Sequence, residues 1–451
     1  MRGTIGGRTG DNLTPIDIVE FVSAYATILI ANGRPKKVVI GRDGRISGPQ
    51  VAELAIQTLI MMGIEVIDTE LSTTPTVEME VTAQNAGGGI ILTASHNPKQ
   101  WNALKFLNDK GEFISAEEGA TLLELASSRA FDYAEIDDLG SRIVVNDSIE
   151  RHINKIHELS TVNVQAIRAR PFTVVVDCIN STGAISIPPL LESLGCKFIL
   201  LNEEITGEFA HNPEPLEIHL RDLAKAVIEN KADMGVSVDP DVDRLAFIDE
   251  NGKYCGEEYT LVMIADWILS QTPGNTVSNL SSTIALKEVT EKYKQKYAAA
   301  AVGEVNVVTK IRETNAIIGG EGNGGIIYPT LHAGRDALVG IALILTALTN
   351  KELSLSQYRG QFPDYTITKK KIDLTADLDV ETLLQSVHQK FSHFECDTQD
   401  GLKVYLEKGW AHLRKSNTEP IIRLIVEASN MTETKNIIDL MEEAIENSLL
   451  N

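Results

Sequence analysis

The chain has 451 residues, a mass of 49.3 kDa and a formal charge of −22, from 63 acidic and 41 basic side chains. Its mean hydropathy of −0.04 and 43% hydrophobic content are typical of an ordinary globular protein, and its length predicts three or four domains. The acidic balance argues against nucleic acid or an anionic membrane surface as a partner, and no apolar run reaches the roughly 18 residues of a membrane span. No signal peptide is recognisable. Four widely spaced cysteines indicate free thiols and therefore a cytoplasmic protein: Cys178, Cys196, Cys255 and Cys396.

Strands and helices alternate over most of the chain. A β-branched run at 37–41, a helical pattern at 50–62 and a strand from residue 64 form a βαβ unit. Similar units are expected at 172–201 and at 276–302. The repetition predicts three similar α/β domains, each with a mainly parallel or mixed sheet.

The last part of the chain has a different pattern. A strand from residue 366, a helix at 380–390, three strands between 402 and 427 and a helix from 432 predict a smaller α+β domain. Gln361–Asp364 is a plausible linker. The apolar stretch Ala337–Leu348 predicts a buried helix. We expect four domains, at 1–150, 151–254, 255–364 and 365–451.

A serine follows the apolar run 89–92, in the segment T-A-S-H-N-P at 93–98, here named the serine loop. The carboxyl end of a strand is where α/β sheets place their sites. Ser95 could therefore carry or transfer a group if a base or a metal activated its hydroxyl. An ordinary turn explains the same residues equally well.

Three aspartates alternate in D-P-D-V-D-R at 239–244, the aspartate loop, directly after the apolar run 234–238. Asp239, Asp241 and Asp243 repel one another unless a divalent cation binds, and all-oxygen ligands favour Mg²⁺ over zinc. Arg244 could neutralise charge or hold a phosphate. A solvated acidic turn is the alternative.

Two further polar loops follow. The glycine-rich loop at 319–325 lets backbone approach a ligand, and Glu321 and Asn323 suit sugar hydroxyls, although a flexible turn has the same composition. The arginine loop at 414–420, with Arg423 beyond it, offers the guanidinium, hydroxyl and amide groups that a phosphate dianion needs. A polar hairpin is the alternative there.

These four loops, in this order, resemble the α-D-phosphohexomutases, which include phosphoglucomutase, phosphomannomutase and phosphoglucosamine mutase. The resemblance covers essentially the whole chain, and T-A-S-H-N-P together with D-P-D-V-D-R is highly specific. It implies three similar α/β domains with mixed sheets plus a C-terminal α+β domain around a central cleft. It also implies an isomerase that interconverts hexose 6-phosphate and hexose 1-phosphate through a phosphoserine and a hexose 1,6-bisphosphate.

The resemblance also implies residue roles. The implied catalytic residues are Ser95 as the phosphoserine, Lys105 as an acid or base, and Arg244. The implied Mg²⁺ ligands are Ser95, Asp239, Asp241 and Asp243. The implied substrate contacts are Arg2, Glu321, Asn323, Arg414, Ser416, Asn417, Thr418 and Arg423. His211 is a weaker candidate, as suited to a structural role as to a functional one.

Three departures from the family pattern matter, and one is that the arginine loop reads S-N-T-E-P, where bacterial glucosamine-type enzymes often have S-G-T-E-P. The strand that precedes the N-terminal Ile-Arg-Gly of the family is missing ahead of Arg2, so we expect a truncated or misassigned start and a poorly anchored Arg2. The glycine-rich loop ends Asn323-Gly324-Gly325, where the best-known members read Ser-Gly-His or Ser-Ala-His.

Within the family, the glycine-rich loop and the T-E-P segment favour glucosamine 6-phosphate and glucosamine 1-phosphate, with phosphomannomutase or phosphoglucomutase as the alternative. A Mg²⁺-dependent sugar phosphatase with an aspartyl nucleophile and a non-catalytic sugar-phosphate binder are further alternatives. The substrate is expected to be a small sugar phosphate, and the chain a monomer or homodimer. A positive cleft in a negative protein is expected, formed by Arg2, Lys105, Arg244, Arg414 and Arg423.

Overall fold

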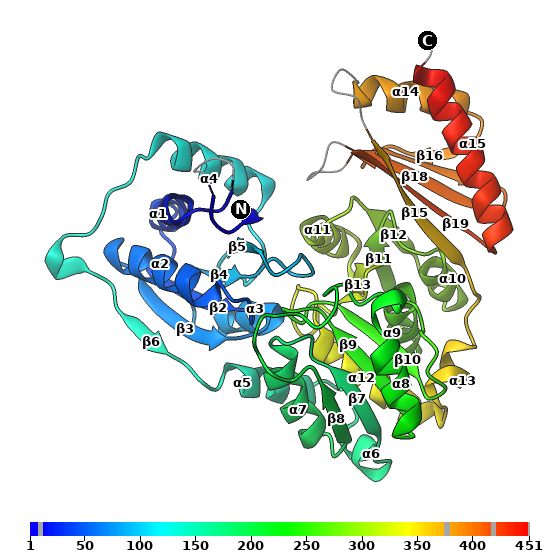
Figure 1. The fold of residues 1–451 in the computed structure, drawn as a ribbon, viewed down its shortest axis with the longest axis horizontal. Helices are drawn as coiled ribbons and strands as arrows, with labels where there is room; N and C mark the ends of the chain where they lie inside the picture. Colours follow the sequence, from blue (N-terminus) through cyan, green and yellow to red (C-terminus); the bar gives the residue numbers. More distant parts are fainter. Residues whose placement is uncertain (8–11, 374–378, 416–420, 450–451) are drawn as a thin grey trace. The chain divides into compact units, whose positions relative to one another are not determined.

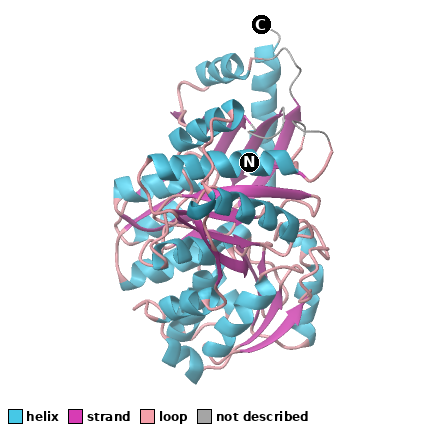
Figure 2. Ribbon diagram, turned by 90° about the vertical axis from the view of Figure 1, so that its left-hand side faces the viewer, coloured by secondary structure: helices cyan, strands magenta, loops and turns pink. Residues whose placement is uncertain are grey.

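The structure, a computed structural model, describes residues 1–7, 12–373, 379–415 and 421–449. Within this part the chain forms two compact units, one of residues 1–272 with 323–359 and the other of residues 273–322 with 360–451. Figure 1 traces the chain, and Figure 2 shows its strands flanked by helices. None of the described helices has the length and apolar character needed to cross a bilayer.

The first α/β domain has a mixed six-stranded sheet in the order β1-β5-β4-β2-β3-β6. Strands β2, β3, β4 and β6 run parallel, whereas β5 is antiparallel to both β4 and β1. Its elements are β1 (Arg2–Thr4), α1 (Pro15–Ala31), β2 (Lys37–Arg42), α2 (Gly48–Met61), β3 (Glu65–Leu71), α3 (Thr74–Ala83), β4 (Gly88–Leu92), β5 (Trp101–Leu107), α4 (Ala116–Ser128) and β6 (Arg142–Val144).

Both faces of this sheet are covered, which explains why its central strands are continuously apolar. Alternate residues of β2 point to opposite faces: Val38 and Ile40 pack against α1, α2 and α4, and Val39 packs against α3. Polar residues therefore lie in the loops at the strand ends. The loops after β2 and β4 lie at the same carboxyl edge, because these two strands are parallel. This edge carries the serine loop.

The second α/β domain has the sheet order β10-β9-β7-β8, with β7, β8 and β9 parallel and β10 antiparallel to β9. Helix α8 packs on one face through Leu223 and Val227. The aspartate loop connects β9 to β10. The elements are α5 (Ser148–His157), α6 (Val164–Ala169), β7 (Thr173–Asp177), α7 (Gly183–Ser193), β8 (Lys197–Leu201), α8 (Arg221–Glu229), β9 (Met234–Val238) and β10 (Leu245–Asp249).

In the third α/β segment, β12, β11 and β13 run parallel in that order. The predicted buried helix is α12, whose first twelve residues are all buried. The elements are α9 (Glu257–Gln271), β11 (Asn275–Asn279), α10 (Ala285–Lys292), β12 (Tyr297–Ala300), α11 (Glu304–Thr314), β13 (Ala316–Glu321), β14 (Gly325–Ile327), α12 (Ala337–Lys351) and α13 (Leu355–Arg359).

The C-terminal domain is an antiparallel five-stranded sheet, ordered β15-β19-β18-β17-β16, with α14 and α15 packed on one face. The α+β prediction is confirmed, but the predicted strand count was wrong. The short strand β16 was missed because its three residues are too few to show a periodicity. The elements are β15 (Thr366–Asp373), α14 (Val380–Lys390), β16 (Glu395–Asp397), β17 (Leu402–Leu406), β18 (Gly409–Lys415), β19 (Ile421–Ala428) and α15 (Met431–Leu449).

Candidate active site

Ser95 lies in the left-handed region, with φ of 49°, directly after β4. This conformation is uncommon for a residue with a side chain and marks a backbone held by its surroundings. Here the Ser95 N–H donates to Thr93 Oγ1 at 2.9 Å, and Ser95 is only 6% exposed. The turn directs Ser95 Oγ to Asp239 Oδ2, to which it donates at 2.6 Å. The two most specific sequence segments thus meet through their side chains.

A buried arginine that sequence reasoning missed holds the serine loop. Arg45 has no exposed surface and donates to the carbonyl oxygens of Ser95, Asn97, Pro98 and Trp101 at distances of 2.5 to 2.9 Å. Its Nε donates to Asp43 Oδ2 at 3.0 Å. Its position after β2, at the same sheet edge as Ser95, was the available signal.

The three carboxylates of the aspartate loop have no exposed surface, and backbone N–H groups of the same loop fix Asp239. Asp239 Oδ1 accepts the N–H groups of Asp243 and Arg244 at 3.2 and 3.1 Å. Asp241 Oδ2 accepts from Thr74 Oγ1 at 2.6 Å and from Lys105 Nζ at 2.8 Å. The loop therefore binds to the start of α3 as well as to the serine loop.

The three carboxylates fit a divalent cation. Their ligand oxygens lie within 4.8 Å of one another, and Asp241 Oδ1 and Asp243 Oδ1 are buried without a hydrogen bond from the residues that the structure describes. Buried unpartnered carboxylate oxygens are costly unless a cation binds them. Burial and the neighbouring charges of Asp243 and Asp241 raise the pKa of Asp239 well above its usual value, which a cation would reverse.

Cations surround the aspartate loop. Burial alone would lower the pKa of Lys105, but Asp241 and Asp243 outweigh it and hold this pKa above its ordinary value. Lys105 is therefore protonated here, as a proton donor must be. Arg244, 8% exposed, donates to Glu214 Oε1 at 3.2 Å, and its Nε lies 4.0 Å from a carboxylate oxygen of Asp239 and of Asp243.

A second arginine was also missed by sequence reasoning. Arg335 Nη2 donates to Asp243 Oδ2 at 2.6 Å, from the loop that precedes α12. Burial and then the charges of Arg244 and Arg335 lower the pKa of His96 to about 2, so the imidazole next to Ser95 is neutral. No local pattern marks Arg335, because its partner is 92 residues away.

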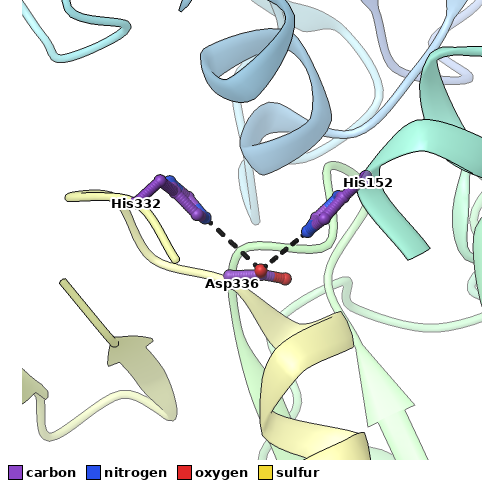
Figure 3. A group of neighbouring side chains, drawn as sticks. All are labelled: His152, His332 and Asp336. Atoms are coloured by element: carbon purple, nitrogen blue, oxygen red, sulfur yellow. Dashed lines mark hydrogen bonds and ion pairs between the residues drawn. The ribbon is translucent and has the colours of Figure 1, made fainter. Parts of the chain in front are cut away.

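A histidine cluster that the sequence also did not predict lies beside this arginine. Figure 3 shows His152 and His332 pointing at Asp336. Their Nε2 atoms lie 2.9 and 3.3 Å from Asp336 Oδ2, and His332 Nδ1 lies 3.3 Å from Glu78 Oε2. Burial opposes the charged imidazole, but Asp336 and Glu78 raise the pKa of His332 to about 10. The cluster ties α3, α5 and the start of α12 together.

The expectation for Arg2 was wrong. Arg2 begins strand β1, which pairs with β5 in the register Arg2 to Ala103, and its Nη1 donates to Asn97 Oδ1 at 3.0 Å. A three-residue strand is stabilised by its partner and has no pattern of its own, so the sequence could not reveal it. Arg2 is thus anchored beside the serine loop.

Glu321 Oε1 accepts from Asn279 Nδ2 at 2.9 Å and from the Gly303 N–H at 3.1 Å. Asn323 Oδ1 accepts the Gly325 N–H at 3.1 Å, which closes the turn before β14.

In the C-terminal sheet, Arg414 and Arg423 are cross-strand neighbours, and Arg414 Nε lies 3.3 Å from Asp400 Oδ2. Two candidate phosphate contacts are thus adjacent at the mouth of the arginine loop. Three further candidates lie outside the described residues: Ser416, Asn417 and Thr418.

His211 has a structural partner. Its Nε2 lies 2.7 Å from Asp177 Oδ2 and its Nδ1 lies 2.8 Å from the Asn212 carbonyl oxygen. Although burial lowers the pKa of His211, the Asp177 carboxylate raises it above the ordinary value. This pairing favours the structural interpretation of the histidine.

Comparisons with known proteins agree with this geometry. The phosphoglucomutase/phosphomannomutase family models match as alpha/beta/alpha domains I, II and III at residues 1–132, 150–252 and 256–365 and as the C-terminal domain at 368–444. The chain is 33% identical to a phosphoglucomutase/phosphomannomutase of Thermococcus kodakarensis, covering 99% of this chain and 98% of the relative. It is 31% identical to a phosphoglucosamine/phosphogalactosamine mutase of Sulfurisphaera tokodaii, covering 98% of both.

A solved structure shares the fold. The crystal structure of a phosphoglucomutase/phosphomannomutase family protein from Burkholderia thailandensis matches with a TM-score of 0.87 at 24% identity. The match covers 99% of this chain and 96% of that one. The chain therefore belongs to the phosphoglucomutase/phosphomannomutase family, whose four domain models match it in order between residues 1 and 444.

Proposed function

We propose that the chain is a phosphohexomutase that interconverts hexose 6-phosphate and hexose 1-phosphate through a phosphoserine at Ser95 and a hexose 1,6-bisphosphate. The observation that carries this proposal is the contact of Ser95 Oγ with Asp239, at 2.6 Å, within a buried three-carboxylate loop. A serine so placed can receive and return a phosphoryl group beside a cation. Family membership supports the same reaction.

Asp239, Asp241 and Asp243, with an oxygen on Ser95, would hold one Mg²⁺. The donor set is all oxygen, which suits Mg²⁺, and two of its carboxylate oxygens have no hydrogen bond from described residues. When bound, Mg²⁺ would neutralise negative charge on the phosphoryl group.

Three side chains around Ser95 would assist the transfer of the phosphoryl group. Lys105, held protonated by Asp241 and Asp243, would donate a proton to the oxygen that loses the phosphoryl group. Arg244 would stabilise the charge that spreads over the phosphoryl oxygens. Arg45 fixes the carbonyl groups of the serine loop, so that Ser95 Oγ stays aligned.

The substrate would be held by residues from all four loops. Arg2 lies beside the serine loop and suits a phosphate. Glu321 and Asn323 would contact sugar hydroxyls. Arg414 and Arg423 would bind the phosphate that is not being transferred, together with Ser416, Asn417 and Thr418. The bisphosphate must present each phosphate to Ser95 in turn, so the arginine loop would accept a phosphate in both orientations.

We propose glucosamine 6-phosphate and glucosamine 1-phosphate as the preferred pair, with mannose or glucose phosphates as the alternative. A relative named as a phosphoglucosamine/phosphogalactosamine mutase supports this choice. The assay measures turnover of glucosamine, glucose and mannose 1-phosphates with coupling enzymes. A preference of about tenfold for glucose or mannose 1-phosphate, equivalent to 1.4 kcal/mol, would contradict the choice.

Two measurements test the reaction itself. Mass spectrometry of the intact protein should find a species heavier by about 80 Da, one phosphoryl group, which maps to Ser95. Ser95→Ala should lose this species and mutase turnover. Ser186→Ala is the matched control, because Ser186 is buried in α7 and its hydroxyl donates to the carbonyl oxygen of Thr182, the N-cap of that helix. Phosphate release that survives in S95A would favour the aspartyl phosphatase instead.

Four domains bounded at 1–150, 151–254, 255–364 and 365–451 complete the proposal. We also propose a cytoplasmic location, because the four cysteines are free. The chain would act as a monomer or homodimer.

A further inference from the structure

Arg335 occupies the space beyond the glycine-rich loop. A Cβ built on Gly325 would lie 2.3 Å from Arg335 Cδ and 3.0 Å from its Cγ. The φ angle of Gly325 is not positive, so its backbone conformation does not require glycine. The side chain of Arg335 is what requires glycine at this position. A side chain at position 325, such as the histidine of the best-known family members, would need the space that Arg335 takes in this chain.

The backbone around Arg335 is held on both sides. Arg335 forms an antiparallel bridge with Ile327, and the next N–H, of Asp336, donates to the Ile326 carbonyl oxygen at 2.8 Å. The carboxylate of Asp336 caps α12 by accepting from the N–H groups of Leu338 and Val339. Its Oδ2 also lies within hydrogen-bond distance of Nε2 of His152 and of His332, as Figure 3 shows.

These contacts restrict where the guanidinium can point. It reaches Asp243 Oδ2 at 2.6 Å, while Asp243 Oδ1 is buried with no hydrogen bond from the described residues. One oxygen of this carboxylate is thus held by Arg335, and the other remains for a cation. Lys105 is the second cation on Asp243 Oδ2, but at 3.5 Å it holds the carboxylate less closely.

We propose that Arg335 is a positioning residue for the metal: it fixes the rotation of Asp243 so that Oδ1 faces the Mg²⁺ position. This inference rests on the proposed function and adds a residue to its site. Mg²⁺ demands near-ideal octahedral geometry, whereas Ca²⁺ accepts flexible sites with more ligands. A fixed Asp243 therefore favours Mg²⁺ over Ca²⁺.

The test measures the affinities of the purified, metal-stripped protein for Mg²⁺ and for Ca²⁺ by titration calorimetry. Removing the positive charge of Arg335 strengthens the binding of both divalent ions through charge alone. This effect cancels in the ratio of the Ca²⁺ dissociation constant to the Mg²⁺ dissociation constant. A change in the ratio therefore reports on positioning. Arg335→Met should reduce the preference for Mg²⁺ over Ca²⁺ by about tenfold, which is the lower end of the loss in metal affinity that follows when a group that orients a metal ligand is removed. Arg335→Lys, which keeps the charge without the fork, should fall between.

Two further variants complete the test. Gly325→Ala leaves Arg335 in the chain but displaces its side chain, so it should lower the ratio as well, even if R335M does not fold. Arg170→Met is the control: Arg170 donates to the carbonyl oxygens of Leu348 and Leu353 and should leave the ratio unchanged.

A ratio within about twofold of the wild-type value in folded R335M or G325A, less than 0.5 kcal/mol, would overturn the positioning role. A different result would contradict the proposed function: the wild-type chain binds Mg²⁺ but turns over no hexose phosphate. The ratio is measured without substrate, so it still decides the role of Arg335 in that case.

Discussion

Arg45→Met removes the guanidinium that holds the serine loop. Four carbonyl oxygens, from Ser95 to Trp101, lose a donor, and the buried carboxylate of Asp43 loses its ion-pair partner at 3.0 Å. Asp43 has no exposed surface, so water cannot replace the guanidinium without opening the loop. We expect the loop to be the part of the protein most affected.

The magnitude follows from the burial of the pair. Breaking a buried ion pair by removing one partner costs about 3–5 kcal/mol. If that cost falls on the serine loop, its amide hydrogens exchange faster by about two to three and a half orders of magnitude, at 1.4 kcal/mol per tenfold. Burial already raises the pKa of Asp43 above its usual 3.8, against the opposing charge of Arg45. Loss of Arg45 raises that pKa further.

The damage caused by the loss of Arg45 depends on pH. A carboxyl group whose pKa is raised in the folded state binds more protons there, so stability is lost as pH rises from 3.8 through the folded pKa. R45M should therefore be less damaged at about pH 5 than at about pH 8. Adding Asp43→Asn removes the stranded charge and should recover part of the loss at the higher pH.

Hydrogen exchange followed by mass spectrometry measures the effect on the peptide that contains residues 93–101. The β17–β18 hairpin (402–415) of the C-terminal sheet is the internal reference, and its exchange should stay as in the wild type. The reasoning is refuted if the serine loop of R45M keeps wild-type protection. It is also refuted if the double variant R45M/D43N is less protected than R45M at both pH values.

Three other substitutions have defined outcomes. Lys105→Met should reduce kcat by about 10²- to 10⁴-fold in the coupled assay, and a loss under tenfold would contradict a role in proton transfer. His332 has a pKa raised from 6.5 to about 10 by its two carboxylates, against burial, so its contribution to stability is complete below 6.5 and lost towards 10. The melting temperature should therefore fall over this range in the wild type and fall less in His332→Gln; equal slopes would exclude the histidine as the cause. Gly324→Ala places a Cβ 2.2 Å from the Leu245 carbonyl oxygen at φ of 84° and should cost more than about 1 kcal/mol in urea unfolding, whereas Gly119→Ala, in open space on α4, should not destabilise the chain.

The four α/β and α+β segments could be predicted because their signals are local. The covered sheet of the first domain gives continuous apolar strands, and the helix periodicity between them is regular. Ser95 and the aspartates were accessible for a related reason: each loop directly follows an apolar run, so its polar residues must lie at a sheet edge. The alternation of the three aspartates also predicted a cation site, because their carboxylates repel one another unless a cation binds.

Arg335 and the histidine cluster could not be predicted, because their roles come from contacts between distant segments, and for Arg45 only its position after β2 was a signal. A buried arginine has the same sequence signature as an exposed one, and arginines are mostly exposed. His152 meets Asp336 across 184 residues, so only the fold brings them together. Gly325 shows the same limit: a glycine-rich loop suggests flexibility, but this glycine is required by the side chain of Arg335.

The charge of −22 is compatible with an anionic substrate because the site is balanced separately from the surface. Three buried aspartates face three cations, Lys105, Arg244 and Arg335, and Glu214 also pairs with Arg244, so the group carries one excess negative charge. Binding of one Mg²⁺ would leave one excess positive charge, and a phosphoserine carries about two negative ones at neutral pH. The metal and the phosphoryl group therefore each remove the charge that the other introduces. In a protein this acidic, that mutual neutralisation explains why a phosphate would enter the site in preference to remaining in solvent, and why the two should bind cooperatively.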